Sequence, residues 1–273
     1  MRVATWNVNS IRARTGRVID WLLRENVDVL AMQETKCSVA QFPVQAFEEA
    51  GYRVEVMGVN QWNGVAFAST LPIDAVTQGF PEAPGFGPEG AVEARALGVE
   101  IAGLALWSLY VPNGRELADP HYRYKLEWLQ RLREHSVAWM RDNPGRPLAL
   151  MGDWNIAPLD SDVWDMRVFA GATHVSQPER DEFFAFEEAG LHDVVRPLVP
   201  DGFTYWDYKQ LRFPRNEGMR IDFILGNDAF ADRVEAAAIF RDERKGEAPS
   251  DHVPVAVDLT DTDAFDDDRP MVF

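Results

Sequence analysis

The chain has 273 residues, 46% of them hydrophobic, and a formal net charge of −17, which fits a globular protein of one large domain or two small ones. Its single cysteine, Cys37, excludes an internal disulfide and fits a reducing compartment such as the cytoplasm. The N-terminal sequence MRVATWNVNS lacks the apolar region of a signal peptide, and no apolar run approaches the ~20 residues of a membrane helix. We therefore expect a cytoplasmic protein that does not bind membranes.

Strands and helices are predicted to alternate in the first half of the chain. Strands are expected at 2–8 and 27–34, with a helix at 14–26 in which Val18, Trp21 and Leu22 share one face. The Gly- and Pro-rich segment 78–90 predicts a long surface loop inserted between two strands, not a domain boundary. A further strand around 102–110 ends in the turn sequence YVPNG.

The second half begins with an amphipathic helix at 122–140, in which Leu126, Leu129 and Leu132 recur at roughly helical spacing. A strand at 147–155 and a helix at 178–189 follow, with Gly190 as the expected C-terminal cap. Strands are then expected at 203–208, 219–225 and 252–259. Because these late strands are adjacent, the pattern favours two packed sheets flanked by helices over a doubly wound parallel sheet. We expect one domain over 1–260 and an acidic, flexible tail over 261–273.

The negative net charge, taken alone, argues against a nucleic-acid partner, because phosphate binders gain affinity at basic patches. The acidic residues are unevenly placed, however, with a dense run in the C-terminal sequence DLTDTDAFDDDRP. Basic residues gather elsewhere, so a local basic face is compatible with the sequence, although solvated helix and loop surface is the favoured interpretation for each of them considered singly. They are Arg12, Arg14, Arg17, Arg123, Lys125, Arg131, Arg133, Lys209, Arg212, Arg215 and Arg220.

Polar side chains recur at the ends of five expected strands, in the sequences WNVN (6–9), QE (33–34), GDWN (152–155), RID (220–222) and SDH (250–252). Side chains at strand ends of a rigid sheet are well placed to converge on one site. Carboxylates and amides without cysteine favour a hard cation such as Mg²⁺ over zinc. Glu34 and Asp251 are the candidate ligands of that cation.

The other polar residues suit hydrolysis of a phosphodiester. His252 is a candidate contact for a phosphate oxygen, and Asp222 a candidate for holding its imidazole in the protonated form. Asp153 with Asn155 would activate and orient a water nucleophile, and Tyr110 would donate to a phosphate oxygen. Structural roles are the alternative for each residue considered singly: turns or caps for Asn7, Asn9, Glu34, Asp153, Asn155 and Asp251, and core packing for Tyr110 and His252.

Seven motifs occur in order from Arg2 to Leu259: TWNVNSIRAR, LAMQETK, SLYVPNG, LMGDWNIAP, TYWDY, RIDFIL and PSDHVPV. On these motifs the chain resembles the exonuclease III family of abasic-site (AP) endonucleases, within the endonuclease/exonuclease/phosphatase superfamily. The resemblance implies an α/β (α+β) fold, a DNase I-like four-layer sandwich of two packed mixed β-sheets flanked by helices.

The resemblance also implies a DNA-repair activity. This activity is Mg²⁺-dependent hydrolysis of the DNA backbone 5′ to abasic sites, together with 3′-to-5′ exonuclease action or 3′-end trimming, and Mn²⁺ is expected to substitute. The expected partner is double-stranded DNA with abasic sites or blocked 3′ ends, bound by a monomer.

Residue roles follow from the same resemblance. Glu34 matches the main metal ligand, with Asn7 and Asp251 around the ion, and Asp153 matches the residue assigned to water activation. Asn155 matches a residue that contacts the phosphate and the transition state, Tyr110 and His252 match phosphate contacts, and Asp222 matches the partner of the histidine. Asn9 and Arg115 are expected to bind the substrate. The pocket for the abasic sugar is expected to be lined by Tyr205 or Trp206, Met219 and Ile221.

Two other functions remain compatible with the sequence. One is hydrolysis of a phosphomonoester, such as an inositol phosphate, or of a phospholipid by an enzyme of the same fold, because fold and core chemistry do not fix the substrate. The other is a DNA-damage-binding scaffold without turnover. The sequences TYWDY and YVPNGR favour the nucleic-acid branch, and the presence of every catalytic residue type argues against loss of turnover.

Overall fold

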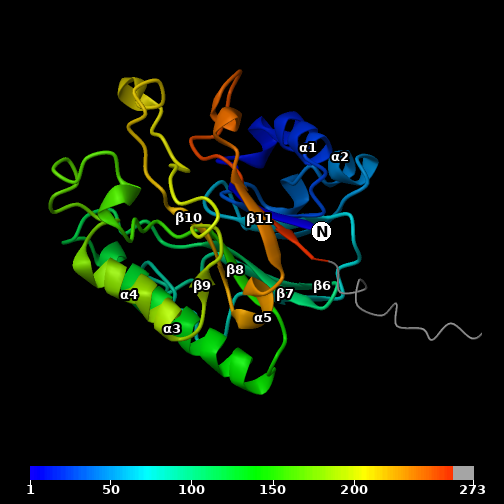
Figure 1. The fold of residues 1–273 in the computed structure, drawn as a ribbon, viewed down its shortest axis with the longest axis horizontal. Coiled ribbons are helices and arrows are strands. Elements are labelled where there is room, and N and C mark those ends of the chain that lie inside the picture. The colour runs from blue at the N-terminus through cyan, green and yellow to red at the C-terminus, as the bar shows by residue number, and fades with distance from the viewer. Residues whose placement is uncertain (261–273) are drawn as a thin grey trace, which may run out of the picture.

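The computed structural model describes residues 1–260, which form two six-stranded sheets packed face to face (Figure 1). The first sheet contains β1 (Arg2–Asn7), β2 (Val29–Gln33), β3 (Arg53–Met57), β4 (Val65–Ser69), β11 (Val234–Ile239) and β12 (Val255–Leu259), in the order β11-β12-β1-β2-β4-β3. The second contains β5 (Ala75–Gln78), β6 (Ala96–Ile101), β7 (Leu104–Tyr110), β8 (Leu148–Asp153), β9 (His192–Asp193) and β10 (Asp222–Gly226), in the order β5-β6-β7-β8-β10-β9. The tail expected at 261–273 lies outside the described residues.

Helices cover both outer faces of this pair of sheets, which completes the expected four-layer sandwich (Figure 1). The helices are α1 (Thr15–Arg24) and α2 (Val44–Glu49) on the first sheet, α3 (Pro120–Asp142) and α4 (Gln177–Glu188) on the second, and the short α5 (Asp228–Ala231) after β10. None of the helices within residues 1–260 combines the length and apolar character needed to cross a bilayer.

Three apolar clusters hold the layers together. Phe67 of β4 and Met151 of β8 belong to the cluster between the sheets. Trp21 of α1 joins the cluster on the outer face of the first sheet, and Trp128 of α3 joins the cluster on the outer face of the second. Burial of each large apolar side chain contributes about 1.5–3 kcal/mol, so the sheets form a rigid platform for the residues at their edges.

Several strands end side by side at one edge of the two sheets. β1 runs parallel to β2 and β7 runs parallel to β8, whereas the other strand pairs are antiparallel. The register places Asn7 opposite Gln33, and it places Asp153 opposite both Tyr110 and Asp222. Polar residues from distant parts of the sequence are therefore neighbours at this edge.

Most predicted elements are confirmed, but the strand expected at 203–208 is wrong. This segment is a loop in which Tyr205 forms isolated bridges with Met219 and His252. The hydroxyl of Thr204 accepts hydrogen bonds from two backbone N–H groups at the start of β10, each at 3.1 Å. Backbone hydrogen bonds therefore join this segment to Met219 on one side and to residues 251–253 on the other, but the segment does not extend either sheet.

Candidate metal and phosphate site

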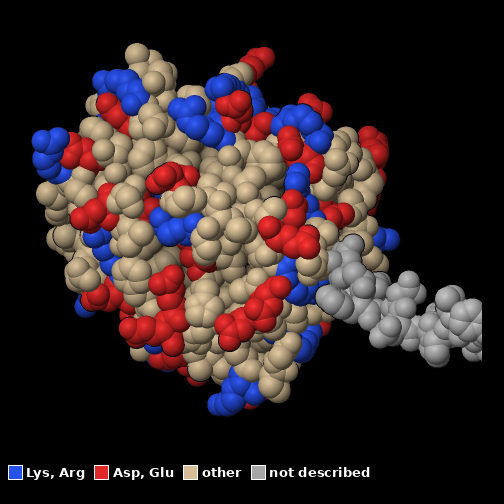
Figure 2. All heavy atoms as spheres, in the orientation of Figure 1, with Lys and Arg blue, Asp and Glu red and all other residues tan. Residues whose placement is uncertain are grey.

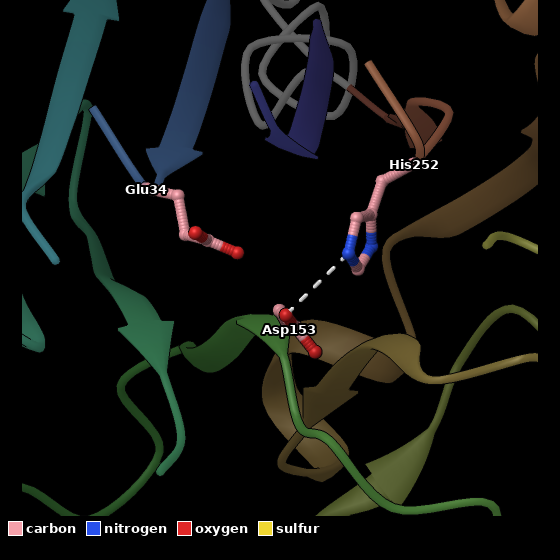
Figure 3. A group of neighbouring side chains, drawn as sticks. All are labelled: Glu34, Asp153 and His252. Atoms are coloured by element: carbon pink, nitrogen blue, oxygen red, sulfur yellow. Dashed lines mark ion pairs between the residues drawn. The ribbon is translucent and has the colours of Figure 1, made fainter. Parts of the chain in front are cut away.

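Three side chains with metal-ligating groups meet at the shared edge of the sheets (Figure 3). Glu34 follows β2, Asp153 ends β8 and His252 precedes β12, and each offers one ligand atom within 4.8 Å of the others. Figure 3 shows the three side chains pointing toward one another from separate elements. The structure thus brings together three residues that are far apart in the sequence.

The buried amide of Asn7 links the two carboxylates. Its Nδ2 donates to Glu34 Oε1 at 2.8 Å and to Asp153 Oδ2 at 2.9 Å, which joins the first sheet to the second. Its Oδ1 accepts the backbone N–H of Asn9 at 3.0 Å. Asn7 therefore makes the turn that its residue type favours and also contacts both carboxylates of the site.

Glu34 is held as an ionised carboxylate. Burial raises the pKa of Glu34, but the ion pair with Lys36 Nζ at 2.7 Å and the hydrogen bond from Asn7 outweigh burial, so the pKa is lowered overall. Glu34 also has a left-handed backbone, with φ of 51°, and such strain is common at functional sites. A fixed, charged oxygen is the ligand that a hard cation requires.

His252 is a buried cation. Its Nδ1 pairs with Asp222 Oδ2 at 2.8 Å. Burial lowers the pKa of His252, but the charges of Asp222 and Asp153 outweigh it and raise the pKa to about 10. A protonated imidazole cannot ligate a metal, so Nε2 is a hydrogen-bond donor at neutral pH. Nε2 lies 3.7 Å from Asp153 Oδ2, too far for a hydrogen bond, and its N–H remains available for a phosphate oxygen (Figure 3).

The pKa of Asp153 is also raised, which in a carboxyl group favours the neutral form. Burial raises the pKa of Asp153 to about 7, helped by the charges of Asp222 and Glu34 and opposed by His252. A carboxylate with a pKa near the working pH is suited to accept a proton from water. Its Oδ1 also accepts the backbone N–H of Asn155 at 2.9 Å, so the Asx-turn and a role in the site coexist.

Replacing Asp222 with asparagine is expected to shift the alkaline limb of the pH–activity profile to lower pH. Asp222 is the strongest of the charges that raise the pKa of His252, so the imidazolium would lose its proton earlier as pH rises. The expected shift is about 1–3 pH units, measured as the pH dependence of kcat/KM on a DNA duplex. Asp228→Asn, which alters an exposed His–Asp pair, is the matched control, and an unmoved limb in Asp222→Asn would contradict the assignment.

Asn155 is fixed by residues that the sequence did not single out. Its Nδ2 donates to the carbonyl of Val111 at 2.9 Å, and its Oδ1 lies 3.1 Å from Asn113 Nδ2 and 3.2 Å from His174 Nε2. Burial, with a contribution from Lys125, lowers the pKa of His174 to about 4, so this histidine is neutral. Asn113 stood in the predicted YVPNG turn, whereas His174 lies in an irregular segment where no pattern pointed to it.

A buried ion pair lies behind Asn155. Lys125 of α3 donates to the carbonyl of Asn155 at 2.6 Å and pairs with Glu179 of α4, and both charged side chains are 0% exposed. Glu179 also accepts the backbone N–H of His174 at 3.0 Å. The two outer helices therefore anchor the loop that carries Asn155, and the expectation that Lys125 is solvated surface is wrong.

Replacing Lys125 with methionine is expected to lower the free energy of unfolding by about 3–5 kcal/mol, because Glu179 would be left as an unpaired buried charge. Chemical denaturation measures this change. The double variant Lys125→Met/Glu179→Gln removes the uncompensated charge and is expected to recover part of the loss. A single variant as stable as the double variant would show that the pair has no such role.

Tyr110 supplies a neutral hydroxyl. Burial and the nearby charge of Glu34 raise the pKa of Tyr110 well above its usual value, although Arg95 opposes them. The Arg95 guanidinium lies 4.7 Å from the centre of the Tyr110 ring and donates to its carbonyl at 3.2 Å. The hydroxyl therefore stays protonated and can donate to a phosphate oxygen.

A second cluster of polar side chains, formed by Asn9, Asp251, Tyr208 and Lys36, lies beside Glu34. Asn9 Nδ2 donates to Asp251 Oδ1 at 2.9 Å and lies 3.3 Å from the hydroxyl of Tyr208, while Lys36 donates to Asn9 Oδ1. Asp251 is not one of the three groups whose ligand atoms approach within 4.8 Å. Its role beside the metal stays a prediction.

The residues expected to form the sugar pocket separate into two sets. Met219 and Ile221 belong to one apolar cluster, and Tyr205 packs against that cluster. The ring of Tyr205 also lies 4.9 Å from that of His252. Trp206 requires a correction, because its side chain has no exposed surface and packs edge-on against two phenylalanine rings. It supports the loop and cannot line a pocket open to substrate.

Charge is unevenly distributed over the surface despite the acidic composition. On the face drawn in Figure 2, basic side chains gather along the upper edge, over the loop before β10 and the segment between β11 and β12, with acidic ones among them. Many of these basic groups are ion-paired, such as Arg212 with Glu217 at 2.6 Å. Arg115, by contrast, has a side chain that is 59% exposed beside the site, with a distant Asp119 partner at 3.8 Å. A local basic face is therefore compatible with the net charge.

The donor set fits a metal ion. Glu34 and Asp153 present carboxylate oxygens that Asn7 holds on a shared side, and no thiol is near enough to favour a softer metal, because Cys37 is buried in the apolar cluster under the first sheet. Oxygen ligands of this kind suit a hard divalent cation that keeps some of its waters.

The chain is similar to characterised nucleases over almost its whole length. It matches the Endonuclease/Exonuclease/phosphatase family over residues 4–252. It is 28% identical over 268 residues to exodeoxyribonuclease III of Haemophilus influenzae, covering 93% of this chain and 98% of that protein.

Solved structures give the same relationship. The 3′-5′ exonuclease NExo of Neisseria meningitidis is 32% identical with a TM-score of 0.88, covering 95% of this chain and 99% of that chain. An AP endonuclease from Archaeoglobus fulgidus is also 32% identical, with a TM-score of 0.87 and coverage of 96% and 100%. The chain therefore belongs to the endonuclease/exonuclease/phosphatase family, in which it is an exodeoxyribonuclease III-like, metal-dependent nuclease that hydrolyses phosphodiester bonds.

Proposed function

We propose that this nuclease uses Mg²⁺, cleaves the DNA backbone 5′ to abasic sites and trims 3′ ends in the 3′-to-5′ direction. Its substrates are double-stranded DNA with abasic sites or blocked 3′ ends. The observation that carries the proposal is the approach of Glu34, Asp153 and His252 to within 4.8 Å of one another. We further propose that residues 1–260 act as one catalytic domain, as a monomer, in the cytoplasm.

Two solved relatives support the choice of substrate. One is described as a 3′ phosphatase from Neisseria bound to product DNA hairpin, and the other as an AP endonuclease. An abasic nucleotide has no base to unstack, so extruding it from the duplex costs little. The apolar cluster of Met219 and Ile221, with Tyr205 against it, suits a sugar that lacks a base.

The side chains divide the hydrolysis among them. Asp153, with a pKa near 7, accepts the proton of the attacking water, and Asn155 is held beside it by Val111 and Asn113. His252, kept protonated by Asp222, donates Nε2–H to a phosphate oxygen. The protonated hydroxyl of Tyr110 is a second, neutral donor to a phosphate oxygen. Glu34 with Asn7 would hold the cation. When bound, the cation would neutralise charge on the phosphate and the leaving oxygen.

Removal of divalent cations is expected to abolish activity. With excess EDTA no divalent cation links the carboxylates of Glu34 and Asp153 to the phosphate, so cleavage should fall below detection, and added Mg²⁺ or Mn²⁺ should restore it. Gel analysis of a labelled duplex measures this. Cleavage that persists in EDTA would remove the metal from the mechanism.

One panel of substrates tests the proposed function. It contains a duplex with a single tetrahydrofuran abasic mimic, a matched blunt duplex and a duplex with a 3′-phosphate, with an inositol phosphate as the competing phosphomonoester. We expect incision 5′ to the mimic and trimming of the 3′ ends, with no release of phosphate from the inositol compound. Turnover of the inositol phosphate alone would replace this proposal with the phosphomonoesterase alternative.

A further inference from the structure

A cavity of about 490 Å³ lies beside the catalytic site, between the segments at 59–63 and 86–95 and the turn that carries Arg115. The first segment is joined to the loop that follows Glu34. The backbone N–H of Thr35 donates to the carbonyl of Gly64 at 3.1 Å, and the backbone N–H of Lys36 donates to the carbonyl of Asn63 at 2.9 Å. On the other side, Arg95 lines the cavity and donates to the carbonyl of Tyr110 at 3.2 Å. The cavity therefore continues the surface on which DNA would lie, and the mechanism above does not use it.

The rim of this cavity carries an exposed aromatic ring. Trp62 is 66% exposed, and Val59 and Val92, which also line the cavity, are 72% and 54% exposed. Three large apolar side chains are therefore exposed to solvent around one hollow, where a ligand would cover them. The backbone N–H of Trp62 donates to Asn60 Oδ1 at 2.9 Å, which fixes the turn that presents the ring.

The polar groups of the cavity leave one cation exposed. The charge of Glu93 is paired with Arg95 at 2.6 Å, and its other carboxylate oxygen accepts a hydrogen bond from the Asn63 amide at 3.0 Å. Arg115, in contrast, extends over the ring of Phe86 at 5.8 Å with a side chain that is 59% exposed. The cavity thus combines the exposed ring of Trp62 with one exposed positive charge, that of Arg115.

We propose that this cavity binds an unpaired nucleotide of the DNA substrate, with its base stacked on Trp62 and its phosphate facing Arg115. Every base has a π-face, so an exposed indole is a sequence-independent platform for single-stranded DNA, and a neighbouring arginine attracts the backbone. The volume lies within the range of about 300–1,000 Å³ that is typical of small-ligand sites. A base inside a duplex is covered on both faces, so only a single-stranded extension or a frayed end offers one. The inference rests on the proposed function and specifies which DNA ends the enzyme binds best.

Fluorescence anisotropy in EDTA, where cleavage is blocked, tests the proposal with three labelled duplexes: blunt, with a 5′ single-stranded extension and with a 3′ extension. Trp62→Ala is expected to weaken binding of at least one extended duplex about 5- to 100-fold while leaving the blunt duplex within about twofold. Trp62→Phe, which keeps a ring, should restore most of the affinity. The control is Val137→Ala, an exposed side chain 44% accessible on α3, 16 residues from His121 and thus roughly 24 Å along the helix.

The outcomes separate this inference from the proposed function. Selective loss on an extended duplex, with recovery in Trp62→Phe, supports the cavity as a single-strand site. An equal loss on all three duplexes, or no loss on any, overturns the inference even if wild-type protein cleaves the blunt and abasic duplexes in Mg²⁺. If wild-type protein cleaves neither duplex in Mg²⁺, the proposed function fails, whatever the anisotropy shows.

Discussion

Replacing Asp153 with asparagine is expected to lower kcat on an abasic duplex about 10²- to 10⁴-fold, which is the usual contribution of a general base. Burial and the neighbouring carboxylates raise the pKa of Asp153 to about 7, and Asp153 is the only carboxylate of the three-residue cluster that contacts both Asn7 and the Asn155 backbone. An amide at this position cannot accept a proton from water, although it has nearly the same shape.

Steady-state kinetics on a duplex with one tetrahydrofuran site measure the effect. The fold is expected to survive, because the substitution keeps the shape of the side chain and removes a charge that burial disfavours. Thermal unfolding of the variant checks this, and Asp74→Asn, an exposed carboxylate outside the site, is the matched control. If Asp153→Asn keeps kcat within a few-fold of wild type, water activation belongs to another residue.

Replacing Glu34 with glutamine is expected to reduce kcat/KM at fixed Mg²⁺ by about 100-fold or more. A cation beside the charge that develops on the phosphate stabilises the transition state by several kcal/mol, and each 1.36 kcal/mol corresponds to a tenfold change in rate. The amide still accepts a hydrogen bond from Asn7, but it carries no charge to hold the ion or to pair with Lys36.

The loss should be partly reversed at higher Mg²⁺, since the variant lowers metal affinity and leaves Asp153 and His252 in place. A Mg²⁺ titration of activity for wild type, Glu34→Gln and the exposed control Glu48→Gln distinguishes this from a general defect. Identical metal dependence in wild type and Glu34→Gln would show that Glu34 is not a ligand.

The sequence predicted the layers and the edge of the site because both follow from local patterns. Continuous apolar runs such as 148–152 identified buried strands, and Asn7, Glu34 and Asp153, which end or follow such runs, were therefore expected at a sheet edge. Their convergence within 4.8 Å with His252 required the resemblance as well, since pairing between the sheets leaves no trace in local sequence.

Two features could not be predicted for physical reasons. Tyr205 and Trp206 are adjacent in an irregular loop, and no periodicity indicates which of them faces the site, so the sequence leaves both as candidates although Trp206 is buried. The ion pair of Lys36 with Glu34 joins two residues that both have left-handed backbone, with φ of 51° in each, and no sequence pattern specifies that conformation.

The burial of Lys125 is indicated by its position in the helix but opposed by its residue type. In α3 it lies three, four and seven residues before Trp128, Leu129 and Leu132, and therefore on the buried face of the helix. A lysine is so rarely buried that its residue type favoured the surface. Only the partner Glu179, 54 residues later and 0% exposed, makes its burial possible.

The proposed mechanism requires a single divalent cation among Glu34, Asp153 and His252, with His252 on the phosphate side. Anomalous diffraction from a crystal soaked in Mn²⁺ tests this most directly. We expect one strong anomalous peak within bonding distance of a Glu34 carboxylate oxygen and none bonded to His252 Nε2. Mn²⁺ found only at other carboxylates, or bonded to the imidazole of His252, would contradict the account.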